Sequence, residues 1–372
     1  MKHALLFSSA LFFSLAAAGC SKVETAQTQT APQVEVSAQV HGATSPEAKP
    51  RAQDPVKLAQ LGARLPAANH FPVKRCINMG NALESSYEGE WGYTIRERDF
   101  HTIAKAGFDT VRIPVRWDEH ISSNPPYTID PARLQRVIDV VGQAQGAGLG
   151  VVLDVHHYRD LMANVTPQTS ERFLAIWSQI SQAFAAAPPS VYFELLNEPT
   201  DADMGELNAL YAQALQIIRR TNPTRAVMMG GNRWNSIDTL GDVRFPRDPY
   251  LVATYHDYGP HEFTHQGASW DENAPPLGQK WGSRKDWDDL RQVIAQASAF
   301  KNRTGLPVFV GEFGVINTVP DTERAQWIKA RRIAMEQAGL SWCVWDYSAA
   351  FNSYDMKRKR WKPVILDALV GR

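Results

Sequence analysis

Residues 191–200 read VYFELLNEPT, an apolar run that stops abruptly at Asn197, Glu198 and Pro199. Branched and aromatic residues with little polar alternation are typical of a β-strand that is covered on both faces. We therefore predict a buried strand that ends in an amide and a carboxylate. A carboxylate at the end of a buried strand needs partners, and these have to come from other parts of the chain.

Seven other apolar runs share this pattern, and segments with a helical period separate them. We predict strands at 75–80, 109–115, 149–155, 191–197, 225–230, 250–256, 307–313 and 341–347. We predict helices at 95–107, 131–148, 171–187, 207–221, 290–305 and 323–339, with weaker ones after Gly231 and at 363–371. Eight alternating strands and helices favour an α/β fold, a closed (β/α)8 TIM barrel. An open doubly wound sheet is the alternative, and it is disfavoured because no Gly-rich phosphate loop follows a strand.

The first 66 residues do not fit this alternation. Residues 1–20 combine Lys2, an apolar stretch and a small-residue end before Cys20, which is typical of a secretory signal peptide. The segment 21–66 is rich in Ala, Gln, Thr, Ser and Pro, so we predict a flexible tether. Residues 67–372 form the predicted barrel domain, which is expected to be a monomer.

The charge balance of the chain excludes some classes of partner. Lysine plus arginine and aspartate plus glutamate both number 39, so the net charge is near zero. Proteins that bind nucleic acid or an anionic membrane surface through charge normally carry a basic excess. We therefore expect no nucleic acid partner and no charge-driven membrane binding.

Polar and aromatic side chains gather at the predicted carboxyl ends of the strands, the face that carries the active site in such barrels. Any one of them alone could be a turn residue, but together they indicate a site. In chain order they are Asn81, Glu84, Arg112, His156, His157, Tyr158, Asn197, Glu198, Asn232, Arg233, Trp234, His256, Asp257, Tyr258, Glu312 and Trp345.

Glu198 and Glu312 stand out in this set. Strands four and seven face each other across a small barrel, so the two carboxylates can flank one bond. Carboxyl groups about 5–5.5 Å apart are the arrangement of a retaining glycosidase, with one nucleophile and one acid/base. We expect Arg112 to hold the pKa of Glu312 low and the pKa of Glu198 to be raised, while Asn197 donates to a sugar 2-hydroxyl. The alternative is that either glutamate only pairs with Arg112.

The adjacent histidines His156 and His157 invite a metal interpretation. Successive residues of a strand point to opposite sides, so we expect the two rings to lie apart. Their spacing differs from that of a helical zinc site, and no Cys or Asp cluster completes a ligand shell. We therefore expect hydrogen-bonding roles, no metal and no cofactor, with a metal-dependent barrel hydrolase as the alternative.

The 11 tryptophans divide into two groups. Aromatic faces in an open groove suit the CH faces of sugar rings, and Trp345, at a strand end, is the best candidate for the floor of the site. We place Trp91, Trp117, Trp234, Trp270, Trp281, Trp345 and Trp361 in strand-end loops, and Trp177, Trp287, Trp327 and Trp342 in the core.

These motifs together resemble glycoside hydrolase family 5, a family of retaining (β/α)8 hydrolases. The resemblance runs from about residue 74 to residue 371 and is carried by INMGNALES (77–85), FDTVRIPVRW (108–117), VVLDVHHY (151–158), FELLNEP (193–199), YHDYGP (255–260), VFVGEFG (308–314) and CVWDYS (343–348). The stretches GNALESSYEGEWG (80–92), EFTHQGASW (262–270) and KWGS (280–283) are similar to bacterial endoglucanases of that family that also accept mannans.

The resemblance implies that Glu198 is the acid/base and Glu312 the nucleophile. Ser85-Ser86 stands where relatives often have Ala-Pro, and the pair Asp346-Tyr347 also varies, so the choice between glucan and mannan stays open. The resemblance implies a supporting shell of Arg112, His156, Asn197, His256 and Tyr258, and sugar contacts from Asn81, Glu84, His157, His265, Trp270 and Trp345.

The three cysteines raise two further questions. The end of the signal peptide, Leu15 to Cys20, resembles a bacterial lipoprotein box, which implies a lipidated Cys20 and an anchor in the outer membrane. A periplasmic or secreted protein is the alternative. For Cys76 and Cys343 we favour two buried thiols, although a closed barrel makes their strands neighbours and leaves a disulfide as the alternative.

The sequence therefore predicts an exported, lipid-anchored and retaining endo-β-1,4-glucanase that acts on a polysaccharide. An endo-β-1,4-mannanase or a mixed β-glucan or glucomannan hydrolase is the alternative within enzymes. A surface lipoprotein that binds polysaccharide on an inactive barrel is the alternative of another class, and it is disfavoured because both glutamates and their shell are present.

Overall fold

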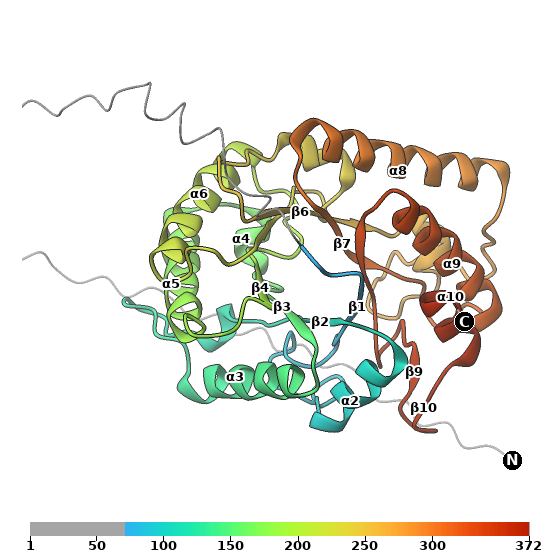
Figure 1. Ribbon diagram of the computed structural model, residues 1–372, viewed down its shortest axis with the longest axis horizontal. Helices are drawn as coiled ribbons and strands as arrows, with labels where there is room; N and C mark the ends of the chain where they lie inside the picture. Colours follow the sequence, from blue (N-terminus) through green and yellow to red (C-terminus); the bar gives the residue numbers. More distant parts are fainter. Residues whose placement is uncertain (1–70, 372) are drawn as a thin grey trace, which may run out of the picture. The chain divides into compact units, whose positions relative to one another are not determined.

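Eight parallel strands close into a barrel, in which each strand pairs with the next along the chain and β8 pairs with β1 (Figure 1). The computed structural model describes residues 71–371, so the predicted signal peptide, Cys20 and the tether at 21–66 lie outside the described residues. The closed order confirms the predicted (β/α)8 barrel and overturns the open doubly wound sheet. The strands are β1 (Arg75–Asn78), β2 (Thr110–Ile113), β3 (Gly150–Asp154), β4 (Val191–Glu194), β5 (Val227–Met229), β6 (Leu251–Asp257), β7 (Val308–Phe313) and β8 (Ser341–Val344).

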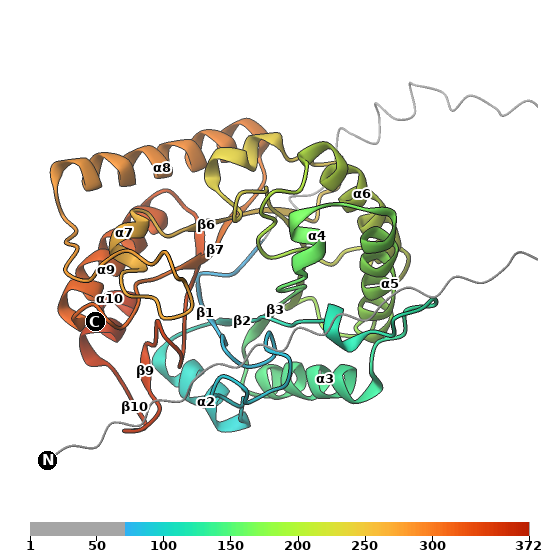
Figure 2. The same cartoon turned by 180° about the vertical axis from the view of Figure 1, so that it is seen from behind.

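Helices surround the barrel on all sides (Figures 1 and 2). Their ends follow from local sequence: Asp130 accepts a hydrogen bond from the Ala132 N–H ahead of Pro131 at the start of α3, and Gly107 ends α2 with a φ of 104°. No helix in residues 71–371 combines the length and the apolar character needed to cross a membrane. The main helices are α2 (Glu97–Ala106), α3 (Pro131–Gly146), α5 (Pro167–Ala183), α6 (Met204–Thr221), α8 (Arg284–Thr304), α9 (Asp321–Gln337) and α10 (Pro363–Val370).

Several short elements in the loops that follow the strands are absent from the prediction, because they are too short to show a period. The 3-10 helix η2 (Ile237–Asp242) lies where a weak helix was expected after Gly231. The unpredicted elements are the 3-10 helix η1 (Asp118–His120), the helices α4 (Arg159–Ala163) and α7 (His261–Thr264), and a hairpin of β9 (Tyr354–Asp355) and β10 (Arg360–Trp361).

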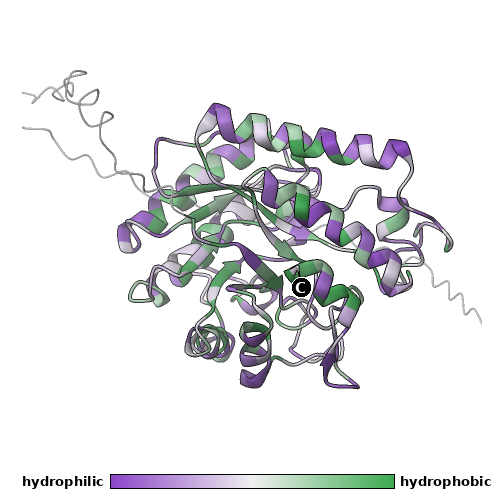
Figure 3. Cartoon of the chain, turned by 45° about the vertical axis from the view of Figure 1, so that its right-hand side comes forward, coloured by the Kyte–Doolittle hydropathy of each residue, from purple (hydrophilic) through white to green (hydrophobic). Residues whose placement is uncertain are grey.

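The interior of the barrel has an apolar lower half, towards the amino ends of the strands, and a polar upper half. Figure 3 shows hydrophobic residues concentrated on the strands. Phe71 packs against the lower half, with ring centroids 5.1 Å from Tyr192 and 5.5 Å from Phe309. The lower half consists of Cys76, Val152, Tyr192, Met228, Val252, Phe309 and Cys343, which form one buried cluster. The upper half begins two residues further along, with the buried side chains of Asn78, Arg112, Asp154 and Glu194.

Cys76 and Cys343 form a disulfide, which corrects the expectation of two free thiols. The two residues are register partners where β1 meets β8, and their Cα atoms are 4.1 Å apart. The sequence places the cysteines on neighbouring strands of a closed barrel, but it does not contain the register. The disulfide therefore joins the first and last strands at the closure of the barrel.

The tryptophans of the predicted core behave differently from one another. Trp177, Trp327 and Trp342 are fully buried, as predicted. Trp287 is 40% exposed, so its placement in the core was wrong. It lies in the first turn of α8 and packs against Trp281, with ring centroids 4.8 Å apart.

Candidate active site

Glu198 and Glu312 lie together at the carboxyl ends of β4 and β7, as the sequence predicts. One carboxylate oxygen of each and a ring nitrogen of His256 all lie within 4.8 Å of one another. His256 Nδ1 is 2.7 Å from Glu198 Oε1 and 3.7 Å from Glu312 Oε2. The side chain of Glu198 is 21% exposed and that of Glu312 is 6% exposed, so Glu198 is the more accessible of the two.

Local irregularities of the sheet bring His256 beside Glu312. The register between β6 and β7 shifts at Tyr255 and His256, so that His256 pairs with Glu312. Such irregularities often occur next to active sites, where they redirect a side chain. Gly311 is required for this approach, because a Cβ atom there would lie 2.9 Å from His256 Nε2.

Arg112 is fully buried below the two glutamates and is shared among three carboxylates. Its Nη1 donates to Glu312 Oε1 at 2.8 Å, its Nε donates to Glu194 at 2.6 Å, and its Nη2 lies 2.8 Å from Asp154. The same guanidinium donates to Asn78 Oδ1 at 2.9 Å and to Asn197 Oδ1 at 2.6 Å. One cation therefore faces three acids, and the buried cluster has an excess of acidic groups.

Asp154, Glu194 and Asn78 were not recognised as part of the site from the sequence. Each lies inside an apolar run, where a single polar residue is also consistent with a satisfied core group. The alternation of side chains along a strand could have identified them. Each lies two residues from another position of its strand whose side chain faces the barrel interior. Their contacts with Arg112 assign them to the site.

Glu312 is held by two donors, yet its pKa is not low. Tyr258 Oη donates to Glu312 Oε2 at 2.8 Å, in addition to Arg112. Burial raises the pKa of Glu312 to about 7, with a further rise from Glu198, and this outweighs the lowering by His256, Arg112 and Tyr258. The expectation of a low pKa was therefore wrong, because burial outweighs the lowering by Arg112, which also faces Glu194 and Asp154.

Burial raises the pKa of Glu198 to about 7 as well, in the expected direction. Two carboxyl groups this close titrate as a pair, so near neutral pH they share about one proton. The pKa of His256 is lowered, mainly by burial, so its ring is neutral beside them. The pair can thus supply one carboxylic acid and one carboxylate at the same time.

His156 and His157 are in contact, which corrects the expectation that their rings lie apart. Strand β3 ends at Asp154, and His157 has a φ of 48°, so neither histidine is in an extended strand. The ring centroids are 4.5 Å apart and T-shaped. His156 Nδ1 lies 2.7 Å from Asp154 Oδ2, and burial lowers the pKa of both histidines.

Trp345 forms an aromatic surface at the end of β8. Its ring is stacked on His156, with centroids 5.9 Å apart and an angle of 5° between the planes. Gly80 makes room for it, because a Cβ atom there would lie 2.9 Å from the indole ring. Trp117, by contrast, is fully buried and donates its indole N–H to Asp154 O at 2.9 Å, so it is a packing residue.

The other predicted sugar-contacting residues lie in loops around this centre. Glu84 is buried, accepts hydrogen bonds from the backbone N–H groups of Asn81 and Ala82, and has a pKa that burial raises to about 7. The ring centroid of Phe351 is 5.2 Å from that of His265 and 6.2 Å from that of Trp270. The side chain of Trp270 is 59% exposed.

The trio Glu198, His256 and Glu312 is also the one group in residues 71–371 whose ligand-type atoms lie close enough together to hold a metal ion. His156 and His157 are not part of such a group. The trio is joined by the hydrogen bond between His256 and Glu198, and Glu312 is bonded to Arg112 and Tyr258. The absence of a metal requirement stays a prediction.

Comparison with known proteins gives a consistent result. Residues 72–351 match the family model of the cellulases of glycosyl hydrolase family 5. Endoglucanase H of Acetivibrio thermocellus is 36% identical over 84% of this chain, and the match spans 32% of that longer protein. Endoglucanase C of the same organism is 28% identical over 75% of this chain and 91% of its own length.

Solved structures resemble the whole barrel. Thermotoga maritima Cel5A in complex with cellobiose has a TM-score of 0.79 and 36% identity, covering 82% of this chain and all of that one. The same enzyme in complex with mannotriose has a TM-score of 0.79 and 35% identity, with the same coverage. A hyperthermophilic endo-β-1,4-glucanase in complex with substrate has a TM-score of 0.80 and 34% identity over 83% of this chain and all of that one.

Proposed function

Since this chain belongs to glycosyl hydrolase family 5 and is a glycoside hydrolase, we propose that it cleaves β-1,4-glucans internally with retention of configuration. The observation that carries this proposal is the spacing of the two glutamates, since one oxygen of Glu198 and one of Glu312 lie within 4.8 Å of each other. An inverting enzyme needs about 6.5–9.5 Å to place a water molecule between its carboxyl groups. The gap between Glu198 and Glu312 is too small for that arrangement.

Glu312 is the nucleophile in this proposal, because two donors hold it in place. Arg112 and Tyr258 bind its two oxygens and favour the ionised form over that of Glu198. The carboxylate attacks the anomeric carbon and forms a covalent glycosyl-enzyme, and the bond to the leaving oxygen breaks.

Glu198 is the acid/base, because it is the more accessible of the two and is bound to one neutral histidine. It protonates the leaving oxygen in the first step. As a carboxylate it then takes a proton from the water that releases the sugar from Glu312. A pKa of about 7 suits both directions of proton transfer near neutral pH.

Asn197 completes the centre. Its Oδ1 accepts from Arg112, which leaves its amide nitrogen without a hydrogen bond in the described part of the chain. That nitrogen can donate to a sugar 2-hydroxyl, a contact that strengthens in the transition state. Trp345 offers an aromatic face to the sugar ring beside it.

The substrate test is a panel of soluble neutral polysaccharides: hydroxyethylcellulose, mixed-linkage β-glucan, glucomannan and mannan. We expect the highest kcat/KM on a glucan, with measurable activity on glucomannan. Mannan tolerance is supported by the similarity to Thermotoga maritima Cel5A, whose structures include a mannotriose complex. A clear preference for mannan would favour the alternative of a β-1,4-mannanase.

The stereochemical test follows the new reducing ends by proton NMR. Retention requires the β-anomer to appear first and to mutarotate afterwards. Initial release of the α-anomer would overturn the assignment of Glu312 as a nucleophile. Activity that persists in a strong chelator would dispose of the metal-dependent alternative, whereas complete lack of turnover would favour a protein that only binds polysaccharide.

We also propose that the enzyme is an exported monomer with lipid on Cys20, anchored in the outer membrane. The support is the sequence of residues 1–20, with its apolar run and lipoprotein-like end. Labelling of cells with a radioactive fatty acid should mark the full-length chain and not its Cys20→Ser variant. An unlabelled chain recovered from the medium would favour the secreted alternative.

A further inference from the structure

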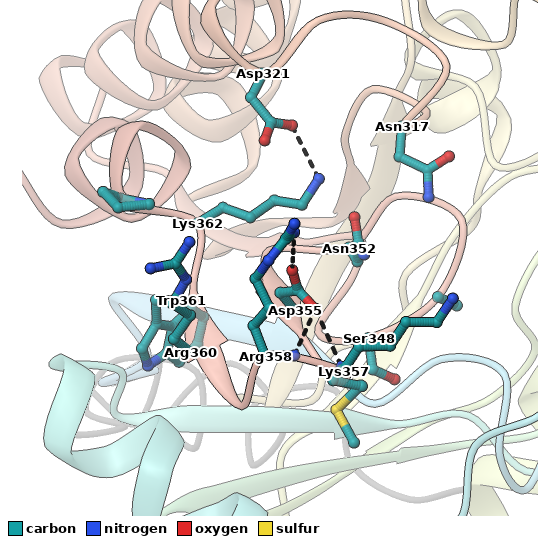
Figure 4. A pocket seen from close by; sticks show the side chains of 13 residues that line it. Asn317, Asp321, Ser348, Asn352, Asp355, Lys357, Arg358, Arg360, Trp361 and Lys362 are labelled. Atoms are coloured by element: carbon teal, nitrogen blue, oxygen red, sulfur yellow. Dashed lines mark hydrogen bonds and ion pairs between the residues drawn. The ribbon is translucent and has the colours of Figure 1, made fainter.

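A second cavity lies outside the catalytic centre, beside the hairpin of β9 and β10 (Figure 4). Its volume is about 520 Å³. The loop at 348–352 separates it from the active site: Phe351 packs against Tyr258 and His265, whereas Ser348 and Asn352 line the cavity. Neither Glu198 nor Glu312 contributes to its walls. The cavity is thus a separate feature of the same face of the barrel.

The hairpin brings an unusual density of positive charge to this cavity. Residues 357–362 read KRKRWK, five cations in six positions of a chain whose overall charge is zero. Two cations of the lining are already paired, Arg358 with Asp355 at 2.9 Å and Lys362 with Asp321 at 2.9 Å (Figure 4). Asp321 also pairs with Arg324 at 2.7 Å, so its single negative charge is already shared by two cations.

Lys357 and Arg360 are the cations that remain. Both line the cavity, and neither side chain forms an ion pair or a hydrogen bond with another residue in 71–371. A guanidinium presents paired donors that match the two oxygens of a carboxylate or a phosphate, and a lysine adds a point charge. Both side chains are exposed, and they leave two charges at the cavity that no residue in 71–371 neutralises, so an anion from solution can bind them.

The neutral polar atoms of the lining indicate that the ligand also carries a hydrogen-bond donor. Ser348 Oγ and Asn352 Oδ1 are shielded from solvent and have no hydrogen-bond partner in the described part of the chain. An amide oxygen only accepts, so an ionised carboxylate alone would leave Asn352 Oδ1 unsatisfied. A hydroxyl group on the ligand satisfies both atoms. Trp361 is half-buried in the lining, and its ring is stacked on Phe108 with centroids 5.6 Å apart.

We propose that this cavity binds a sugar that carries an acidic group, either a carboxylate or a phosphate. Lys357 and Arg360 bind the acid, and Ser348 and Asn352 take the hydroxyls. The choice of a sugar rests on the proposed function, since the neighbouring site acts on polysaccharide. The cavity would then recognise acidic units on or near the polymer being cleaved, at a point that does not take part in hydrolysis.

The test uses the full chain labelled with ¹⁵N-tryptophan, with the Trp361 indole signal assigned by the Trp361→Phe variant. Glucuronate and glucose 6-phosphate are titrated as the two acidic probes, with glucose and inorganic phosphate as references. We expect both acidic sugars to shift the Trp361 signal with saturation and to leave the Trp345 signal unchanged. Saturation with only one of them identifies the acid that the cavity accepts.

A double variant with a matched control locates the binding. Lys357→Gln combined with Arg360→Gln should weaken the binding of the acidic sugars at least tenfold. Lys359→Gln removes the same kind of charge from the same hairpin, but Lys359 does not line the cavity, so its binding should change less than twofold. Equal shifts with glucose, equal binding of inorganic phosphate, or an equal loss in Lys359→Gln would each overturn the proposal.

Failure of the proposed function can be told apart from failure of this inference. Hydrolysis of neutral hydroxyethylcellulose should be unchanged in the double variant and in Lys359→Gln, which also shows that they are folded. Conversely, the Glu312→Gln variant should lose hydrolysis and keep the Trp361 shift with acidic sugars. Loss of that shift in Glu312→Gln would mean that the sugars bind in the catalytic centre, and the separate site would be refuted.

Discussion

The lower and upper halves of the barrel interior are built by the same strands and have opposite character. On β1, β3 and β4 the lower half has Cys76, Val152 and Tyr192, and two residues further on the upper half has Asn78, Asp154 and Glu194. A step of about 6.6 Å along a strand therefore changes the interior from apolar packing to buried charge. In this fold, stability and chemistry are separated along the strand axis, and not among different strands.

The two halves also differ in energetic cost. Apolar side chains in the lower half gain free energy by leaving water, and the disulfide adds a covalent link between β1 and β8. The upper half buries Arg112 with three carboxylates, and such a cluster seldom stabilises more than apolar packing of the same volume. We infer that the lower half supports an upper half that is kept for catalysis.

The largest effect should come from the upper half and should leave the fold intact. We expect Glu312→Gln and Glu198→Gln each to lower kcat on hydroxyethylcellulose roughly 10³–10⁶-fold. Thermal unfolding should show a stability no lower than that of the parent, because each change removes a buried acid. Glu206→Gln, on the exposed side of α6, is the matched control and should keep full activity.

The same variants distinguish the two roles. An aryl cellobioside with a good leaving group needs no acid in the first step, so Glu198→Gln should still give a burst of the aryl product. Glu312→Gln should give none. A burst from Glu312→Gln and none from Glu198→Gln would reverse the assignment of the two glutamates.

The next effect tests whether the upper half depends on its single cation. Arg112→Met leaves Asp154, Glu194 and Glu312 without their shared partner, and we expect a loss of about 3–5 kcal/mol in the free energy of unfolding at pH 7. The loss should shrink towards pH 5, where the carboxylates bind protons. Urea unfolding at both values checks this, with the exposed Arg284→Met as the control, and a loss independent of pH would contradict the charge argument.

The lower half is tested by its disulfide. Replacing Cys76 and Cys343 together with alanine should lower the free energy of unfolding by about 2–5 kcal/mol, because the cross-link closes a long loop in the unfolded chain. The kcat of the folded variant should change little, since no atom of the pair touches the upper half's hydrogen bonds. A large drop in kcat without loss of stability would show that the two halves are coupled.

The last effect is the pH dependence of stability. The pKa of Glu198 is about 7 in the folded protein, above its ordinary value, so the folded state binds more protons than the unfolded state between about pH 4 and 7. The contribution of Glu198 to stability is therefore lost as the pH rises through this window. Glu198→Gln should gain about 3 kcal/mol in the free energy of unfolding over the parent at pH 8 and about nothing at pH 4. A gain that is the same at both values would argue against a buried acid.

The sequence was sufficient for the architecture, because each strand carries a mostly apolar run that can be recognised without its partners. It also placed Glu198 and Glu312 at strand ends, where Asn-Glu-Pro and Gly-Glu-Phe interrupt those runs. Whether they act as the acid/base and the nucleophile stays a prediction for the variants above.

Properties that depend on register and on shared partners could not be predicted in the same way. The disulfide requires the alignment of β1 with β8, and the pKa of Glu312 depends mainly on its burial and on the charged groups that the fold brings around it. Neither the disulfide nor this pKa can be predicted from one segment of the sequence alone. The hairpin at β9 and β10 was missed for another reason, since two-residue strands have no measurable period.

The contacts of Phe71 show at which end of the barrel the described chain begins. Its ring lies against Tyr192 and Phe309, so the described chain enters the domain at the mouth opposite to Glu198. Anything attached ahead of residue 71 is thus joined to the rear of the catalyst. A long glucan can therefore approach Glu198 without passing the residue at which the described chain begins.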